Sequence, residues 1–270
     1  SSVNITADFI GNSASLSSMI SNRGFIGNIS GNFMGNFGQA IYNSSNGTAI
    51  IGDITGNFLS NYVQYLSKYS KLTLGGAVYS NANLSFTAKG KQRFFSGNYT
   101  NDQTRGKNYN ALFVQSVTDL ASAPVIAFDT TGGGAWVVND SIEGADTISW
   151  DMEGKIDYSS HYTLTFKGDG ALNEDGLTNQ YISINNDIIN AGVVIVDATT
   201  LRFGAYQHED QTANNWDGHG RFIAALNADG TADLDAAAVT SLSLNNAAFD
   251  LYNQYQDTVE LAGYKANNSF

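Results

Sequence analysis

Acidic residues gather around two of the three histidines of this chain, and a metal site is the first chemistry to consider there. His208 and His219 flank Glu209, Asp210 and Asp217 within one polar stretch. Imidazole and carboxylate are zinc ligands. However, the eleven-residue spacing of the two histidines within a loop matches no zinc motif. We therefore expect no metal at these residues.

A second acidic stretch resembles the middle of a calcium loop. Asp229 and Asp233 supply oxygen atoms at a suitable spacing. The first and last ligand positions of such a loop would fall on Ala225 and Ala236, which have no side-chain oxygen. We interpret the Asp-Gly pair at 229–230 as a turn, keep Asp229 and Asp233 as weak calcium candidates, and expect no cofactor.

Paired carboxylates would be the chemistry of a polysaccharide-cleaving enzyme. Four acidic residues lie close together in the sequence, but the sequence does not establish whether any two share a face: Asp146, Asp151, Glu153 and Asp157. No Gly-x-Ser-x-Gly motif is present. The chain has no cysteine, which excludes a thiolate metal site, a cysteine nucleophile and a disulfide. We predict that the chain is not an enzyme and keep a polysaccharide-acting enzyme as an alternative.

Three sets of residues could instead bind a partner. Tyr62, Tyr65 and Tyr69 have near-helical spacing, which predicts a helical turn or an extruded loop, either as a packed lid or as an aromatic binding surface. Basic residues cluster next and could bind an anionic polymer or form a solvated face: Lys89, Lys91, Arg93, Arg105 and Lys107. Trp216 and His219 lie in a polar insertion at 205–220, and loops of this kind often carry function.

The elements that must position these residues come from a repeated phrase. ITADFIGN at 5–12 returns as ISGNFMGN at 29–36 and as ITGNFLSN at 54–61, at offsets of 24 and 25 residues. Apolar residues two apart predict a strand with one buried face and a polar outer face, and Gly-Asn or Ser-Asn predicts a turn. A second phrase reads SMISN at 18–22, QAIYN at 39–43 and GAVYS at 76–80.

Two or three short strands in such a repeat leave no room for a crossover helix, so the repeat predicts one coil of a parallel β-solenoid. Stacked coils would place Ile5, Ile29 and Ile54 in one column and Phe9, Phe33 and Phe58 in another. Asn12, Asn36 and Asn61 would form an amide ladder. We predict an all-β, single-domain solenoid over residues 1–270, with coils of about 20–25 residues and a few protruding loops.

Length and composition fit this prediction. The chain has 270 residues with one proline, 28 glycines and only 14% charged residues, against about 25% in ordinary globular domains. At about 24 residues per coil we expect roughly eleven coils. Residues 1–61 should hold the most regular coils, 62–72 and 205–220 the insertions, and 238–270 the last coils. Residues 1–111 carry a net charge of +5 and the remainder −17. This asymmetry would suit association between copies, or it reflects separate tuning of each half for solubility.

The phrases GNISGNF and GDITGNF, with GQAIYNS between them, resemble passenger domains of bacterial autotransporters, the type V secretion proteins. The closing stretch 238–252 resembles them as well. The resemblance implies a right-handed parallel β-helix, export through an outer-membrane β-barrel beyond residue 270, and display at the bacterial cell surface. It also favours the non-enzymatic members of that family.

Taken together, these features predict an extracellular, surface-displayed adhesin or self-associating passenger domain that acts by binding. Its partner would be a host or matrix glycan or protein, or a second copy of itself. We expect no nucleic acid as a partner. A structural stalk that holds another domain away from the membrane is a further alternative.

Overall fold

The computed structural model describes residues 3–44, 49–64, 75–102, 106–115, 122–145, 158–170, 180–211, 220–226, 232–233, 239 and 241–251. These residues form β-strands and their connections, and no α-helix occurs among them.

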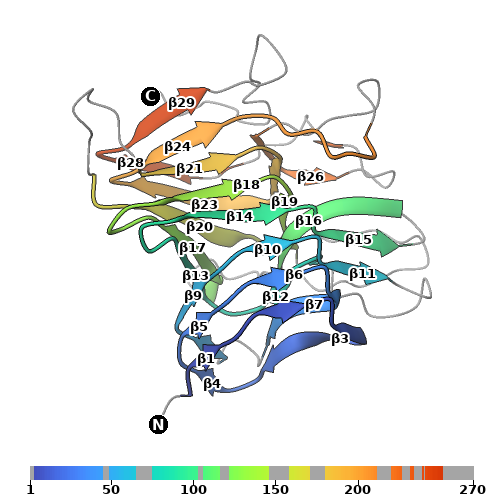
Figure 1. Ribbon diagram of the computed structural model, residues 1–270. Helices are drawn as coiled ribbons and strands as arrows, with labels where there is room; N and C mark the ends of the chain where they lie inside the picture. The colour runs from blue at the N-terminus through green and yellow to red at the C-terminus, as the bar shows by residue number, and fades with distance from the viewer. Residues whose placement is uncertain are drawn as a thin grey trace.

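Three sheets contain nearly all the strands (Figure 1). Sheet A runs in the order β1 (Ile5–Thr6), β5 (Ile29–Ser30), β9 (Asp53–Thr55), β13 (Leu84–Thr87), β17 (Val125–Asp129), β20 (Tyr162–Lys167), β23 (Ala191–Asp197) and β28 (Ser241–Asn245). Sheet B runs in the order β2 (Phe9–Ile10), β6 (Phe33–Met34), β10 (Phe58–Leu59), β14 (Gln92–Ser96), β18 (Ala135–Val138), β21 (Tyr181–Ile184), β24 (Thr200–Phe203) and β29 (Ala248–Leu251). Sheet C contains β3 (Ser13–Asn22), β7 (Phe37–Asn43), β11 (Tyr62–Gln64), β12 (Val78–Ser80), β15 (Tyr99–Asp102), β16 (Gly106–Gln115), β19 (Ser141–Ala145), β22 (Asp187–Ile189) and β25 (Arg221–Ile223).

Two small pairs complete the structure. β4 (Phe25–Ile26) pairs in parallel with β8 (Ile50–Ile51), and β26 (Ala225–Leu226) pairs antiparallel with β27 (Ala232–Asp233). The strands of sheets A and B are parallel throughout, because the chain visits A, B and C in turn and then repeats. We call each such passage a coil. The arrangement is compatible with a β-solenoid.

The coils are fewer and longer than the repeat predicts. Sheets A and B each hold eight strands, so the described chain passes through eight coils rather than eleven. Stacked residues are 24 apart between Ile5 and Ile29, but 42 apart between Phe86 and Phe128. Residues added between strands lengthen most of the later coils, although Ile184 and Phe203 of sheet B are only 19 apart. The predicted length of 20–25 residues therefore holds only near the N-terminus.

The predicted register of the first coils is confirmed. Ile29 pairs with both Ile5 and Ile54, and Phe33 pairs with both Phe9 and Phe58. The rings of Phe33 stack on these neighbours at centroid distances of 4.9 and 5.1 Å. Parallel pairing in register places identical side chains directly above one another, which is why a short phrase defines the stack.

The second phrase is also in register. Ile41 pairs with both Ile20 and Val78 in sheet C. Alternation predicts that Thr55 lies on the polar outer face of its strand, but Thr55 is buried and its hydroxyl lies 2.8 Å from that of Thr87. Not all residues of the outer face are therefore exposed to solvent.

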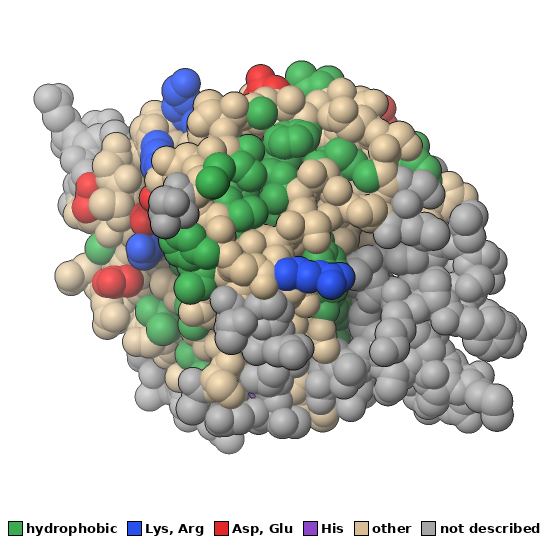
Figure 2. All heavy atoms as spheres, turned by 90° about the horizontal axis from the view of Figure 1, so that it is seen from below, with side chains coloured by type: hydrophobic (Ala, Val, Ile, Leu, Met, Phe, Trp, Pro, Cys, Tyr) green, Lys and Arg blue, Asp and Glu red, His purple; other side chains and the backbone are tan. Residues whose placement is uncertain are grey.

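The core lies between the three sheets and consists of aliphatic and aromatic side chains, among them Phe58, Phe95 and Trp136, which are fully buried. This apolar interior reaches the N-terminal end of the stack, where hydrophobic side chains gather in Figure 2. Val3, Ile10 and Phe25 are each more than half exposed.

The predicted insertion at 62–72 begins later than expected. Tyr62–Gln64 form β11, and Tyr62 pairs with Phe37 and Tyr99. The prediction of a helical turn or extruded loop is therefore wrong for 62–64, since the backbone there pairs with neighbouring coils. Residues 65–74, with Tyr65 and Tyr69, lie outside the described residues, as do 212–219 and 252–270.

The connections from sheet B to sheet C set up the site described next. Six of them contain two residues each: 11–12, 35–36, 60–61, 97–98, 139–140 and 185–186. The seventh, 204–220, joins Phe203 of β24 to Arg221 of β25 and is much longer. Its described part, 204–211, crosses back over earlier coils.

Candidate functional site

An amide ladder runs along the corner between sheets B and C. Asn12, Asn36 and Asn61 each donate from Nδ2 to Oδ1 of the asparagine one coil further on, at 3.2, 2.7 and 2.8 Å. Their backbone N–H groups donate to the same oxygen atoms. The predicted three-residue ladder is confirmed, and Asn98 extends it by one coil.

Asp140 ends this ladder. Asn98 donates to Asp140 Oδ2 from its backbone N at 3.0 Å and from Nδ2 at 2.8 Å. Gly97 N donates to Oδ1 at 2.8 Å, and His208 Nε2 lies 3.3 Å from the same Oδ1. Nitrogen atoms thus face both carboxylate oxygens. An asparagine here would turn an NH₂ group toward one set of donors, so the position requires an acid.

His208 reaches Asp140 from the long connection 204–220. Its Nε2 lies 3.2 Å from the carbonyl oxygen of Asn139 and 3.3 Å from Asp140 Oδ1. Because a carbonyl oxygen can only accept, Nε2 carries the proton. The His208 ring stacks on that of Tyr109 at 3.4 Å, and its side chain is 4% exposed.

Charged groups close the outer side of this stack. Lys107 Nζ donates to Asp210 Oδ2 at 2.7 Å, and the hydroxyl of Tyr109 donates to Asp210 Oδ1. The same ammonium lies 4.3 Å from the ring centroid of Tyr99 and 4.7 Å from that of Tyr109. We call Asp140, His208, Tyr109, Asp210 and Lys107 the His208 cluster.

Burial controls the ionisation of this cluster. It raises the pKa of Asp140 to about 7, although hydrogen bonds from Asn98 and Gly97 oppose the rise. It lowers the pKa of His208 to about 4, against the hydrogen bond to the Asn139 carbonyl. It also raises the pKa of Tyr109 to about 12. At neutral pH the imidazole is therefore uncharged, and Tyr109 keeps its proton.

The contacts of the His208 cluster join segments that are far apart in the sequence. An acid oriented against a histidine is two-thirds of a nucleophilic triad. In the part of the chain that the structure describes, no serine or threonine hydroxyl bonds to His208, and no group of three metal-ligating side chains is found. Contacts join 208–210 to the β15–β16 hairpin, about one hundred residues earlier in the chain, and to the connection 139–140.

Tyr62, the one described member of the predicted tyrosine surface, is a stacked residue. Its ring lies between those of Phe37 and Tyr99, at centroid distances of 5.0 and 5.3 Å. Both ring faces are covered by aromatic neighbours, and Tyr62 is half-buried. The other predicted partners, Arg105, Trp216 and His219, lie outside the described residues.

The structure divides the predicted basic cluster. Lys89 lies 3.6 Å from Asp53, and Arg93 donates from Nε to the carbonyl oxygen of Ala88 at 3.3 Å. Lys91 is exposed in the same turn. Lys107 belongs instead to the His208 cluster, on sheet C.

The acidic candidates are mostly outside the described residues. Asp229 and the carboxylates at 146–157 lie there, while Asp233 is placed in β27. The calcium site and the polysaccharide-cleaving alternative therefore stay predictions.

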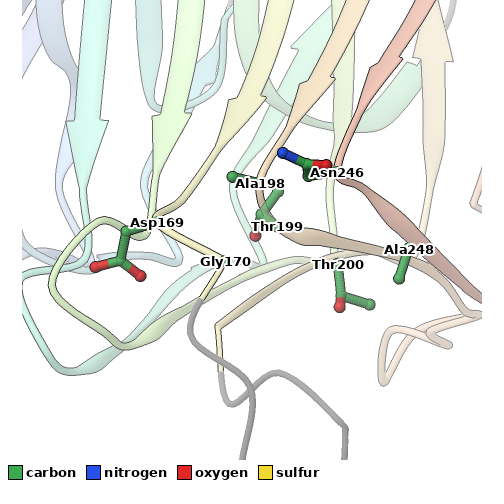
Figure 3. Close-up of a pocket in the computed structure, with 7 residues that line it drawn as sticks. All are labelled: Asp169, Gly170, Ala198, Thr199, Thr200, Asn246 and Ala248. Carbon is green, nitrogen blue, oxygen red and sulfur yellow. The ribbon is translucent and has the colours of Figure 1, made fainter.

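A hollow of about 330 Å³ lies at the corner between sheets A and B (Figure 3). Its lining residues are Asp169, Gly170, Ala198, Thr199, Thr200, Asn246 and Ala248. In Figure 3, Asp169 lies on the opposite side of Gly170 from Thr199 and Thr200. The Asp169 carboxylate accepts hydrogen bonds from Gly132 N and from Gln180 Nε2. The polar groups do not converge, and we assign no ligand to this hollow.

Sequence reasoning missed Asp140, and it considered His208 only as a metal ligand. A signal for Asp140 exists, because Gly97-Asn98 and Asn139-Asp140 each follow a strand of sheet B just as Gly11-Asn12 does. No comparable signal exists for His208, because it contacts a coil far from its own place in the repeat.

No helix among the described residues is long and apolar enough to cross a membrane. Comparison with protein-family models, with curated proteins and with solved structures finds no match to this chain.

Proposed function

We propose that this chain is a right-handed parallel β-helix displayed on the bacterial cell surface, and that it acts by binding. Its sheet topology is compatible with a β-helix. The resemblance of GNISGNF, at 27–33, and GDITGNF, at 52–58, to autotransporter passenger domains supports the handedness and the location.

Departures from the simple coil concentrate on sheet C. Residues 65–77 separate β11 from β12, and both strands pair with β7. One coil further on, β15 turns back antiparallel on β16, beside β11 (Figure 1). The connection 204–220 reaches the same hairpin. We call β11, the β15–β16 hairpin and 205–211 the sheet C platform.

The observation that carries the proposal is the ion pair that joins the two halves of this platform. Lys107 and Asp210 are 103 residues apart and meet at 2.7 Å, with side chains 37% and 47% exposed. The Lys107 ammonium lies over the rings of Tyr99 and Tyr109, and the ring of Tyr206 lies edge-on to that of His208. All three tyrosines are half-buried. Tyrosine and charged residues on a fixed scaffold are typical of binding surfaces, because little ordering cost remains when the partner arrives.

A foreign ligand and a second copy are both compatible with this surface. The net charge of +5 over residues 1–111 and −17 over the remainder favours contacts between copies. Sedimentation of the purified chain against protein concentration and salt separates the two. Association that weakens as salt rises supports self-recognition, whereas a monomer at every salt concentration directs the search to glycans and matrix proteins.

Two matched lysine variants test the platform itself. Lys107→Ala removes a cation from the platform, and Lys167→Ala removes one from sheet A, where Lys167 pairs with Asp129 at 2.9 Å. Exposed ion pairs contribute about 0–1 kcal/mol to stability, so both variants should stay folded. We expect Lys107→Ala to weaken binding or self-association roughly tenfold and Lys167→Ala to leave it unchanged. Equal effects of the two substitutions would show that the platform is not the binding surface. If the chain neither self-associates nor binds a glycan or matrix protein, the alternative of a structural stalk is favoured.

A further inference from the structure

Three strands of sheet A, β1, β5 and β13, are each preceded by an asparagine that opens the same kind of tripeptide. The tripeptides are Asn4-Ile5-Thr6, Asn28-Ile29-Ser30 and Asn83-Leu84-Ser85. Each matches Asn-x-Ser/Thr, the acceptor sequence for N-linked glycosylation. In each, the middle residue packs in or against the core. Because side chains alternate along a strand, the asparagine and the hydroxyl residue both point outward.

The side-chain nitrogen of these asparagines has no hydrogen-bond partner in the part of the chain that the structure describes. Oδ1 of Asn4 accepts the backbone N–H of Asn28 at 2.8 Å, and Oδ1 of Asn28 accepts that of Asp53 at 2.9 Å. Oδ1 of Asn83 accepts the N–H of Val125 at 2.8 Å. All three asparagines are exposed, and their Nδ2 atoms form no hydrogen bond with any described residue.

The same tripeptide occurs at buried asparagines, and there the side-chain nitrogen donates hydrogen bonds. Nδ2 of Asn98 donates to Phe58 O and to Asp140 Oδ2, both at 2.8 Å. Nδ2 of Asn139 donates to Ser96 Oγ at 3.0 Å, and Asn139 is 5% exposed. A substituent on either nitrogen would break an inter-coil hydrogen bond and would have no space.

We propose that Asn4, Asn28 and Asn83 are acceptors for N-linked glycosylation. In this reaction Nδ2 forms a bond to the anomeric carbon of a sugar, the bond from that carbon to the phosphate of an activated glycosyl donor breaks, and the amide loses one proton while the phosphate leaves. A transferase and a nucleotide- or lipid-linked sugar supply the chemistry. The modified amide keeps Oδ1 as an acceptor, so the inter-coil hydrogen bond survives.

Coil spacing limits how many acceptors can be used at once. Ile5 pairs directly with Ile29, so Asn4 and Asn28 lie one strand spacing apart, about 4.8 Å. Two sugar rings cannot attach side by side at that distance without crowding. We expect one of these two to be occupied, together with Asn83. The inference concerns sheet A and goes beyond the proposed binding function on sheet C.

The test uses the folded chain, a nucleotide-activated hexose and a soluble N-glycosyltransferase chosen because it modifies a synthetic peptide of residues 26–32. Intact mass and peptide mapping then report the number and position of added hexoses. Among these tripeptides, we expect addition at Asn83 and at one of Asn4 and Asn28, and none at Asn98 or Asn139. Ser30→Ala and Ser85→Ala are the matched controls, because each keeps the asparagine and removes the acceptor motif.

Two results would overturn the assignment. One is a folded chain that stays unmodified while the peptide is modified. The other is addition at Asn98 or Asn139 as fast as at Asn83, which would mean that amide exposure does not select the acceptor. Circular dichroism of the modified chain should match that of the unmodified chain, since the ladder hydrogen bonds are retained.

Discussion

Asp140 and His208 should contribute opposite pH dependences that cancel in the intact protein. The pKa of Asp140 rises from 3.8 to about 7 on folding, so its contribution to stability is greatest below pH 3.8 and is lost as pH rises toward 7. The pKa of His208 falls from 6.5 to about 4, so its contribution is complete above pH 6.5 and is lost as pH falls toward 4. Between these limits one group takes up the proton that the other releases.

Replacing either residue should reveal how the free energy of unfolding depends on pH through the other residue. One group with a shifted pKa changes the free energy of unfolding by about 1.4 kcal/mol per pH unit. Over the window from pH 4 to 6.5 this is about 3 kcal/mol, an upper value for each variant. His208→Gln keeps a hydrogen-bond donor without titrating, and its stability should fall as pH rises. Asp140→Asn leaves His208 to titrate alone, and its stability should rise with pH.

Urea unfolding at several pH values, followed by tryptophan fluorescence, measures these slopes. Asp140→Asn should also lose about 1–3 kcal/mol at every pH, because donors of Gly97 and His208 then face an amide NH₂. The slope relative to wild type is therefore the test, because contributions from groups that the variants share with wild type cancel in that difference. Variants that both follow the wild-type slope, or that deviate in the same direction, would refute the compensation.

Three further predictions concern the stack and are measured as free energies of unfolding in urea. Asn61→Ala should cost about 2–4 kcal/mol, because it leaves the carbonyl oxygen of Phe33 and the side-chain amide of Asn36 without their buried partner. Asn57→Ala, at the half-buried corner, should cost about 1 kcal/mol. Similar losses at both positions would contradict the role of burial. Phe58→Ala removes a ring stacked at 5.1 and 4.4 Å on Phe33 and Phe95 and should cost about 3–5 kcal/mol, with Phe58→Leu recovering more than half. Gly31→Ala would place Cβ 1.8 Å from the carbonyl oxygen of Ala7 and should prevent the first coils from stacking. The Cβ of Gly35→Ala meets no atom within 4 Å, so this variant should cost only about 1–2 kcal/mol, for its positive φ. An equal cost of the two variants would argue against close contact between coils at Gly31.

The first coils were predictable because their columns consist of identical residues. Ile, Phe and Asn recur at a nearly constant offset, and parallel in-register pairing is the arrangement that places like on like. The number of coils was not predictable from that offset. Residues such as 130–134 and 168–180 separate strands of sheets A and B, so the repeat period varies and the repeated sequence phrase is lost. Stacked columns of side chains nevertheless continue, for example through Phe86, Phe128 and Phe166.

The candidate site was only half predictable, for a related reason. The amide ladder follows the repeat, so Asn12, Asn36 and Asn61 could be placed together from sequence alone. The contact of His208 with Tyr109 depends on a connection that crosses back over coils, at a separation that no local pattern encodes. Repeat reasoning identifies what stacks, and it does not identify what folds across the stack.

The polarity of the ladders explains where their acids lie. At the corner between sheets A and B, Asn57 donates to Asn32 and Asn32 donates to Asp8, so hydrogen bonds point toward the N-terminal end. At the corner between sheets B and C they point the opposite way, from Asn12 through Asn98 to Asp140. An interior member must both accept and donate, which requires an amide, whereas the last acceptor has no further oxygen to donate to. An aspartate in a column of asparagines therefore marks the accepting end of a ladder. The ladder between sheets A and B has its accepting end at Asp8, which is exposed to solvent. The ladder between sheets B and C has its accepting end at Asp140, which is buried, so His208 comes from another coil to complete the set of donors around that carboxylate.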